Sequence, residues 1–145
     1  MELMFAHQWS PAKNGSTSYH YGESVSPDFK LMWAKPAVYR WNVFQSAPGD
    51  LKMAYVGEAE ILTRRIYHYS HPGPSQQTNL RLKAYFERQI SEGHRVLLEV
   101  LDFEPFTLNG LVVSPADLTD KLVRRFVESL AGLWTKQDGF TLLNL

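Results

Sequence analysis

The stretch that decides the fold is residues 37–69, AVYRWNVFQSAPGDLKMAYVGEAEILTRRIYHY. Residues 37–44 and 52–57 within it are rich in β-branched and aromatic side chains, which favour strands. Residues 46–50, SAPGD, have the composition of a turn. We therefore predict a hairpin of two strands, the second of which ends at Gly57.

Two helices and a further strand are predicted after this hairpin. Apolar side chains recur at helical spacing over residues 60–70 and again over residues 77–91. Residues 95–103, RVLLEVLDF, form the apolar run of a buried strand. Residues 104–113 are expected to form a loop or short strand with an Asn-Gly turn.

The strongest signal for a helix start lies near the C-terminus. Ser114, Pro115 and Asp117 form a capping box with proline at the first helical position, which predicts a helix from there to about Trp134. At about 100° per residue, Glu128 falls outside the apolar stripe of this helix, so we expect it to face a cleft. The predicted buried stripe consists of Leu118, Leu122, Phe126, Leu130 and Leu133.

The element order β-β-α-α-β-α predicts an α+β fold. We expect a small, three-stranded, mainly antiparallel sheet flanked by helices, with residues 140–145 compatible with one more strand. Residues 1–35 are an N-terminal extension, expected to pack on the domain formed by residues 36–145. Within the extension, residues 10–28 are rich in Ser, Gly and Pro and predict a loop, in which residues 18–21 are compatible with a short strand. Residues 29–33 fit another short strand.

Composition excludes several classes of protein. The 145 residues contain no cysteine, which excludes disulfide scaffolds, thiolate metal sites and a cysteine nucleophile. No apolar run approaches the roughly 18 residues of a membrane span, and the N-terminus lacks the pattern of a secretory signal. We therefore expect a soluble cytoplasmic protein that does not contact membranes.

Charge is balanced overall but not locally. The chain carries 15 basic and 15 acidic side chains, which argues against a general nucleic-acid coat protein. Residues 61–95, however, carry six basic and only two acidic side chains. A local basic stretch is typical of phosphate binding, although a solvated helix surface has the same composition.

Two tripeptides and an arginine resemble a known nuclease family. Ala37-Val38-Tyr39 and Tyr55-Val56-Gly57 stand on the two predicted hairpin strands, and Arg65 follows in the next helix with Tyr69 four residues later. With the later acidic and amide residues, this ordered set resembles the GIY-YIG nuclease family over residues 36–145.

The resemblance implies hydrolysis of phosphodiester bonds in DNA. By this resemblance Glu128 holds a divalent ion, Mg²⁺ or Mn²⁺, and Arg65 holds the scissile phosphate. Tyr39 would act as general base or water positioner, with a pKa lowered by nearby cations, and Tyr55 would hydrogen-bond the phosphate. The implied catalytic set is Tyr39, Tyr55, Arg65, Tyr69, Glu128 and Asn144.

The implied partner is DNA, and a homodimer would let two sites cut two strands. Asn144 corresponds to the asparagine that ties the end of the chain to the site. The side chains expected to contact nucleic acid are Arg64, His68, Asn79, Arg81 and Lys83.

The chain departs from the family pattern in two places, and alternatives stay open. Ala37 stands where the family usually has glycine, and Tyr55 follows Tyr39 by 16 residues, a longer hairpin than usual. Arg64, with His68 four residues later, competes with Arg65 for the phosphate. A module that binds nucleic acid or protein with weak or no catalysis is the second interpretation, and a coincidental match in a plain α+β protein is the third.

Overall fold

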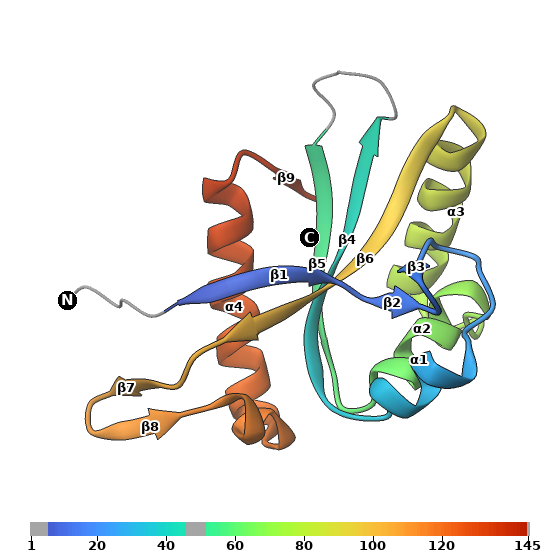
Figure 1. Ribbon diagram of the computed structural model, residues 1–145. Helices are drawn as coiled ribbons and strands as arrows, with labels where there is room; N and C mark the ends of the chain where they lie inside the picture. Colours follow the sequence, from blue (N-terminus) through green and yellow to red (C-terminus); the bar gives the residue numbers. More distant parts are fainter. Residues whose placement is uncertain (1–5, 46–51, 145) are drawn as a thin grey trace.

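The computed structural model describes residues 6–45 and 52–144. Its main sheet has five strands in the order β1-β6-β4-β5-β9 (Figure 1). Every neighbouring pair in it is antiparallel except β5 and β9, which are parallel. These strands are β1 (His7–Pro11), β4 (Ala37–Gln45), β5 (Lys52–Ala59), β6 (His94–Phe103) and β9 (Thr141–Leu142).

Helices and two small hairpins complete the fold. The hairpins pair β2 with β3 and β7 with β8. Among the described residues no helix has the length and apolar character needed to cross a membrane. The bounds are β2 (Lys13–Asn14), β3 (Thr17–Ser18), α1 (Pro27–Met32), α2 (Leu62–Ser70), α3 (Gln77–Ser91), β7 (Phe106–Leu108), β8 (Leu111–Val113), the 3₁₀ helix η1 (Pro115–Thr119) and α4 (Lys121–Gln137).

The expectation of a small three-stranded sheet is wrong. The three predicted strands are the central ones, β6, β4 and β5, but β1 adds to one edge and β9 to the other, and the result is a mixed sheet. Both additional strands are short and lie near the ends of the chain, and β9 pairs only two of its residues. β1 does not alternate between buried and exposed residues, and β9 is too short to show any alternation, so neither has the sequence pattern of a strand. The predicted turn at residues 46–50 lies outside the described residues.

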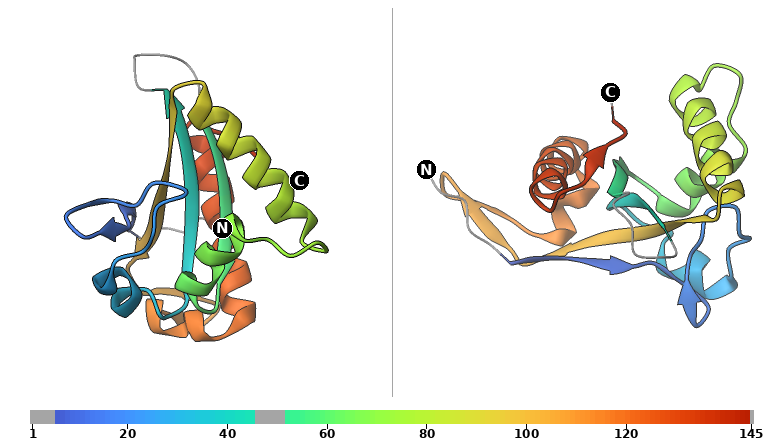
Figure 2. Two further views of the ribbon diagram at one scale, coloured as in Figure 1. Left: turned by 90° about the vertical axis from the view of Figure 1, so that its right-hand side faces the viewer. Right: turned by 90° about the horizontal axis from the view of Figure 1, so that it is seen from above.

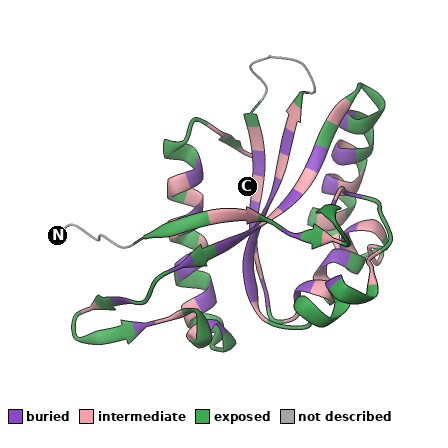
Figure 3. Ribbon diagram, viewed as in Figure 1, coloured by how far each residue is buried: buried purple, intermediate pink, exposed green. Residues whose placement is uncertain are grey.

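The sheet separates two layers of helices. Successive side chains of a strand point to opposite faces, and in β4 Tyr39 and Trp41 pack with α2 and α3, whereas Val38 packs with α4. Figure 1 shows α4 on one side of β4 and β5 and α3 on the other, and the view from above in Figure 2 shows the same separation. Each helical layer therefore covers its own hydrophobic core, and buried residues gather along the central strands (Figure 3).

Residues 6–35 contribute to both cores, and most of their buried aromatic side chains lie in the one under α2 and α3. β1 pairs with β6, and Tyr19, Tyr21 and Phe29 are buried against Trp41 and α3. The short strand expected at residues 29–33 is wrong, because Ser26 caps a helix there that begins at Pro27. A serine cap followed by proline is a strong helix start, and it outweighs the β propensity of the residues that follow.

The start and the buried face of the last helix also differ from expectation. The capping box at Ser114 opens the 3₁₀ helix η1, and α4 begins only at Lys121 with Asp120 as its cap. Leu122 and Leu133 are 76% and 58% exposed, and Phe126 is exposed too, so most of the predicted stripe faces solvent. The buried residues of α4 are Arg124, Val127, Ala131 and Thr135.

Candidate functional site

Three tyrosines and an arginine converge where β5 meets α2. The hydroxyl of Tyr39 on β4 lies 2.6 Å from the hydroxyl of Tyr69 on α2. The ring of Tyr55 on β5 lies 6.3 Å from the Tyr69 ring at an interplanar angle of 75°. Tyr39 and Tyr69 are fully enclosed, whereas Tyr55 is half-buried. The two hairpin tyrosines and the helical tyrosine predicted from the sequence therefore form one cluster.

Gly57 makes room for the ring of Tyr39. The two residues face each other across β4 and β5, and a Cβ atom at position 57 would lie 2.5 Å from the Tyr39 hydroxyl. Such an approach is sterically impossible, so only glycine permits this ring position. The prediction that Gly57 ends the strand is wrong, because β5 continues to Ala59.

Arg65, rather than Arg64, is the arginine of this cluster. Burial lowers the pKa of Arg65, but Tyr39, Tyr69 and Glu58 outweigh burial and raise that pKa above its ordinary value. Arg64, one residue earlier on α2, is exposed. The helix thus presents the pair Arg65 and Tyr69 to the cluster, whereas Arg64 faces solvent.

Glu128 approaches the same cluster from α4, on the other side of the sheet. Burial and the neighbouring Glu58 raise the pKa of the Glu128 carboxyl, while Arg65, Arg125 and the backbone N–H of Glu58 oppose the rise. The Glu128 charge in turn acts on Tyr55. Glu128 also lines a hollow of about 420 Å³, together with Val56, Lys136 and Asn144. The carboxylate is therefore close to the phenols and the guanidinium and open to solvent.

Backbone groups of Ala54, Val56 and Glu58 lie along one edge of β5 and bind the end of the chain and α4. Backbone groups of alternate residues point to the same edge of a strand. The carbonyl of Ala54 accepts from the Leu143 N–H at 2.8 Å. The N–H and carbonyl of Val56 bond the Asn144 side chain at 3.0 and 2.7 Å. Glu128 takes the next position, the N–H of Glu58. Asn144 thus ties the end of the chain to the strand that bears Tyr55.

Two charged residues of this region were not predicted. Nε of Arg124, which is buried on α4, donates to the Glu58 carboxylate at 2.6 Å. The same guanidinium donates to the carbonyls of Leu118 and Thr119 at the end of η1. Glu58 is therefore neutralised by a fixed cation, and Glu128 remains as the carboxylate directed to the hollow. For Glu58, the signal in the sequence was an acidic residue directly after the Tyr-Val-Gly tripeptide.

The expected lowering of the Tyr39 pKa is not found. Burial raises the pKa of the Tyr39 phenol well above its ordinary value, although Arg65 and the Tyr69 hydrogen bond oppose this. Burial and the charge of Glu128 also raise the pKa of Tyr55. All three phenols of the cluster are consequently neutral near pH 7, because the pKa of Tyr69 is raised as well.

The residues expected to contact nucleic acid are scattered. Arg81 donates to the Leu143 carbonyl at 3.0 Å and is close enough to influence Tyr55. Asn79 bonds Gln76 on its own helix. Lys83 pairs with Glu87 at 2.8 Å and lines a different hollow, beside Tyr19. Arg81 therefore borders the cluster, whereas Lys83 does not.

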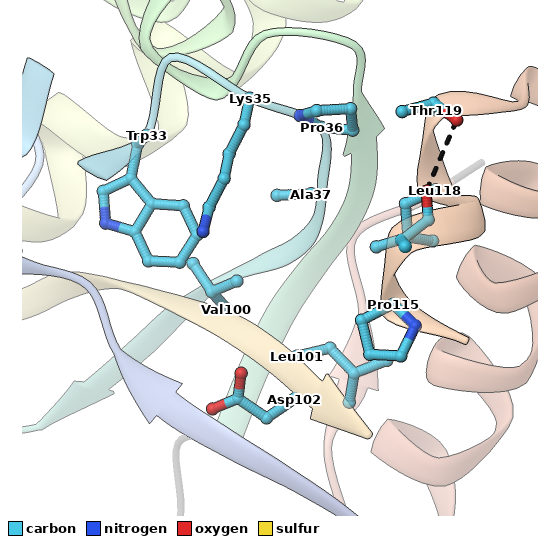
Figure 4. Close-up of a pocket in the computed structure, with 11 residues that line it drawn as sticks. Trp33, Lys35, Pro36, Ala37, Val100, Leu101, Asp102, Pro115, Leu118 and Thr119 are labelled. Atoms are coloured by element: carbon cyan, nitrogen blue, oxygen red, sulfur yellow. Dashed lines mark hydrogen bonds between the residues drawn. The ribbon is translucent and has the colours of Figure 1, made fainter. Parts of the chain in front are cut away.

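A third hollow lies beside η1 and the start of β4 (Figure 4). Its volume is about 320 Å³. Lys35 places its ammonium 5.2 Å from the centre of the Trp33 ring at one side. Val100 and Leu118 contribute apolar walls. The residues lining it include none of the tyrosines, Arg65 or Glu128, so it is separate from the cluster.

The cluster fits a single hydrated cation better than an all-protein metal cage. Among residues 6–45 and 52–144, no group of three or more His, Cys, Asp or Glu side chains is placed to share an ion. Mg²⁺ keeps several waters and needs only one or two carboxylates together with substrate phosphate. Glu128 lines an open hollow and interacts electrostatically with Arg65, so it could supply that single carboxylate.

Comparison of the chain with protein-family models, with curated proteins and with solved structures finds no significant match in any of the three.

Proposed function

We propose that this protein is a metal-dependent endonuclease that hydrolyses phosphodiester bonds in DNA, of the GIY-YIG type. The observation that supports the proposal is the convergence of Tyr39, Tyr55, Arg65, Tyr69 and Glu128, which come from both layers of the fold. These residues lie up to 89 positions apart in the chain. This convergence supports the proposal, because a coincidental match of letters does not require a guanidinium, a carboxylate and the phenols to lie close together.

The half-buried residues of the cluster meet the substrate. Arg65 holds the scissile phosphate through two parallel N–H donors, a geometry that a guanidinium provides and an ammonium does not. Tyr55 donates a hydrogen bond to the same phosphate, because its phenol stays protonated. Glu128 holds Mg²⁺ through the carboxylate. When bound, such an ion would supply charge neutralisation at the phosphate and a water of lowered pKa.

The enclosed tyrosines act as positioning residues. Tyr39 and Tyr69 are hydrogen-bonded to each other and are almost inaccessible to solvent. Their electrostatic contact is with Arg65, whose pKa they raise. From the buried side of the cluster, they hold the Arg65 guanidinium in place. The proposal gives Tyr39 no role as a general base. A protonated, enclosed phenol has no means to take a proton from water.

The enclosure of Tyr39 also favours a second candidate, a module that binds nucleic acid without cutting it. Such a module would use Arg65 and Arg81 to hold phosphate and would use Glu128 only to cap the N–H of Glu58. Binding to DNA that weakens linearly on a log–log plot against salt, with no turnover in any divalent ion, identifies this alternative.

Plasmid nicking in Mg²⁺ or Mn²⁺ tests the nuclease proposal. Wild type should convert supercoiled DNA to nicked circles, and Glu128→Ala and Arg65→Ala should abolish the conversion while circular dichroism shows an intact fold. Arg64→Ala decides between the two neighbouring arginines, because loss of cleavage in this variant with cleavage retained in Arg65→Ala would shift the phosphate role to Arg64. If wild type and Glu128→Ala behave alike with every form of DNA, the proposal is lost.

A further inference from the structure

The outer side of α4 carries two cations, one before and one after Glu128 along the helix. Arg125 and Lys136 are both exposed, and Lys136 lines the same hollow as Glu128. At about 100° per residue, Lys136 lies roughly 20° around the helix from Arg125, and Glu128 lies roughly 60° to the other side. The carboxylate therefore stands between the two cations along the helix axis, next to their line.

We infer that a DNA strand runs along α4 from Arg125 past Glu128 to Lys136, so that these two cations hold the phosphates that flank the one to be cut. The inference rests on the proposed function and assigns to it a path for the substrate strand. It replaces the expectation that α3, through Lys83, holds the DNA.

The spacing along the helix suits a strand. At about 1.5 Å per residue, Arg125 lies about 4.5 Å before Glu128 and Lys136 about 12 Å after it. The total, about 16.5 Å, is the axial length of roughly five nucleotides of one strand at about 3.4 Å each. Arg125 thus reaches the phosphate next to the scissile one, and Lys136 one that lies farther along.

The hollow that Glu128 and Lys136 line gives the strand room. Gly132 lies on its floor, where a Cβ atom would still be 3.8 Å from the nearest side-chain atom, on Leu142. Val56, Leu133 and Leu142 make much of the wall, and Ser129 adds a hydroxyl-bearing residue. An apolar wall beneath a charged border matches a nucleotide, whose sugar and base are far less polar than its phosphate.

The two carboxylates of the candidate site, Glu58 and Glu128, do not oppose this path. Glu58 is held by Arg124, so its charge is already compensated. Glu128 is the carboxylate assigned to the cation, and Arg125 is close enough to lower its pKa. With Arg65 and Arg81 on the α2 and α3 side, the border of the cluster is cationic on both sides.

Binding without cleavage tests the inference. We would measure the fluorescence anisotropy of a short fluorescein-labelled duplex, and of its single strand, in EDTA over a range of salt. Arg125→Gln and Lys136→Gln should each weaken binding several-fold and reduce the log–log salt slope by about 0.9. Lys13→Gln is the matched control, because Lys13 is exposed on the β2–β3 hairpin, away from α4 in Figure 1.

The outcomes separate this inference from the proposed function. If wild type cuts DNA and both variants bind with the affinity and salt slope of Lys13→Gln, the strand path is wrong and the nuclease proposal stands. If wild type never cuts DNA but the variants bind weakly, the path stands and the nuclease proposal fails. An acidic peptide of equal charge that binds as tightly as DNA would overturn the path, since it would assign the surface to acidic proteins.

Discussion

The ionised carboxylate of Glu128 destabilises the folded state. Its pKa is raised chiefly by burial and by the nearby charge of Glu58, which means that the folded state disfavours the ionised form. Proteins retain such groups mainly where function needs them, because sites adapted to a ligand are seldom optimal for stability. The cost and its pH dependence can both be measured.

Glu128→Gln should lose cleavage but not stability. The amide oxygen still accepts from the Glu58 N–H, and the unfavourable charge is gone, so at pH 7 the variant should equal or exceed wild type by less than about 1 kcal/mol. A carboxyl with a raised pKa destabilises the fold at pH values above that pKa, and the penalty disappears as pH falls through it. Thermal melts of both proteins from pH 7 to pH 4 should therefore converge.

A variant markedly less stable than wild type at pH 7 would contradict this prediction. It would show that Glu128 has a structural role, in which its negative charge strengthens the hydrogen bond from the Glu58 N–H.

Gly57→Ala should be strongly destabilising. The added Cβ would meet the hydroxyl of Tyr39 at 2.5 Å and its Cζ at 2.6 Å, and both atoms belong to a ring enclosed in the core. Displacing such a ring costs about 1–3 kcal/mol. Gly132→Ala is the control, because it lies within α4 with its nearest neighbour at 3.8 Å and should gain up to about 1 kcal/mol. Urea denaturation should give opposite signs for the two substitutions, and equal signs would refute the argument.

At the scale of elements, the sequence predicted strands and helices that have a clear internal pattern. The β-rich runs of β4 and β5 and the helical periodicity of α2 and α3 are local signals, and the structure has these elements close to the expected positions. The Tyr-Val-Gly tripeptide and the arginine eight residues later are local as well. This is why the α2 side of the site could be located from the sequence.

The buried face of α4 could not be predicted, because its partners are distant. Arg124 and Thr135 occupy buried positions of the helix that a hydrophobic pattern assigns to apolar residues. Arg124 bonds Glu58, 66 residues earlier, and Thr135 accepts from the buried Arg40, 95 residues earlier. Buried polar side chains are tolerated when such partners satisfy them, and a linear pattern does not show these pairings.

Asn144 acts as an extension of β9. Its side chain satisfies the N–H and carbonyl of Val56, which β9 itself is too short to reach. Asn144→Ala should therefore cost about 1 kcal/mol and raise the hydrogen-exchange rate of the Val56 amide. Asn144→Asp keeps the acceptor and should preserve the protection of that amide, although it no longer donates to the carbonyl. Unchanged exchange at Val56 in Asn144→Ala would disprove this role.

At the scale of the molecule, the site lies where the two helical layers meet around one edge of the sheet. Tyr55 and Val56 are neighbours on β5 and belong to different cores, so α2 and α4 reach the site from opposite faces. Neither layer contains the whole site. β9 pairs only with Met53 and Ala54, so this edge of β5 is uncovered at Glu58. A longer neighbouring strand would cover it, and Glu128 could not then reach the Glu58 N–H from α4.

Residues 36–145 should not fold stably without the N-terminal stretch. Removing residues 1–35 would take away β1 from the edge of β6 and three aromatic residues, Tyr19, Tyr21 and Phe29, from the core around Trp41. Each aromatic side chain contributes about 1.5–3 kcal/mol by burial, and their sum is comparable with the whole stability of a typical domain. The shortened chain should aggregate on size-exclusion chromatography and show no cooperative melt. Phe29→Ala in the full chain should cost about 3–5 kcal/mol. A shortened chain that melts cooperatively near the wild-type temperature would show that the resemblance marks an independent domain, to which the N-terminal stretch is only attached.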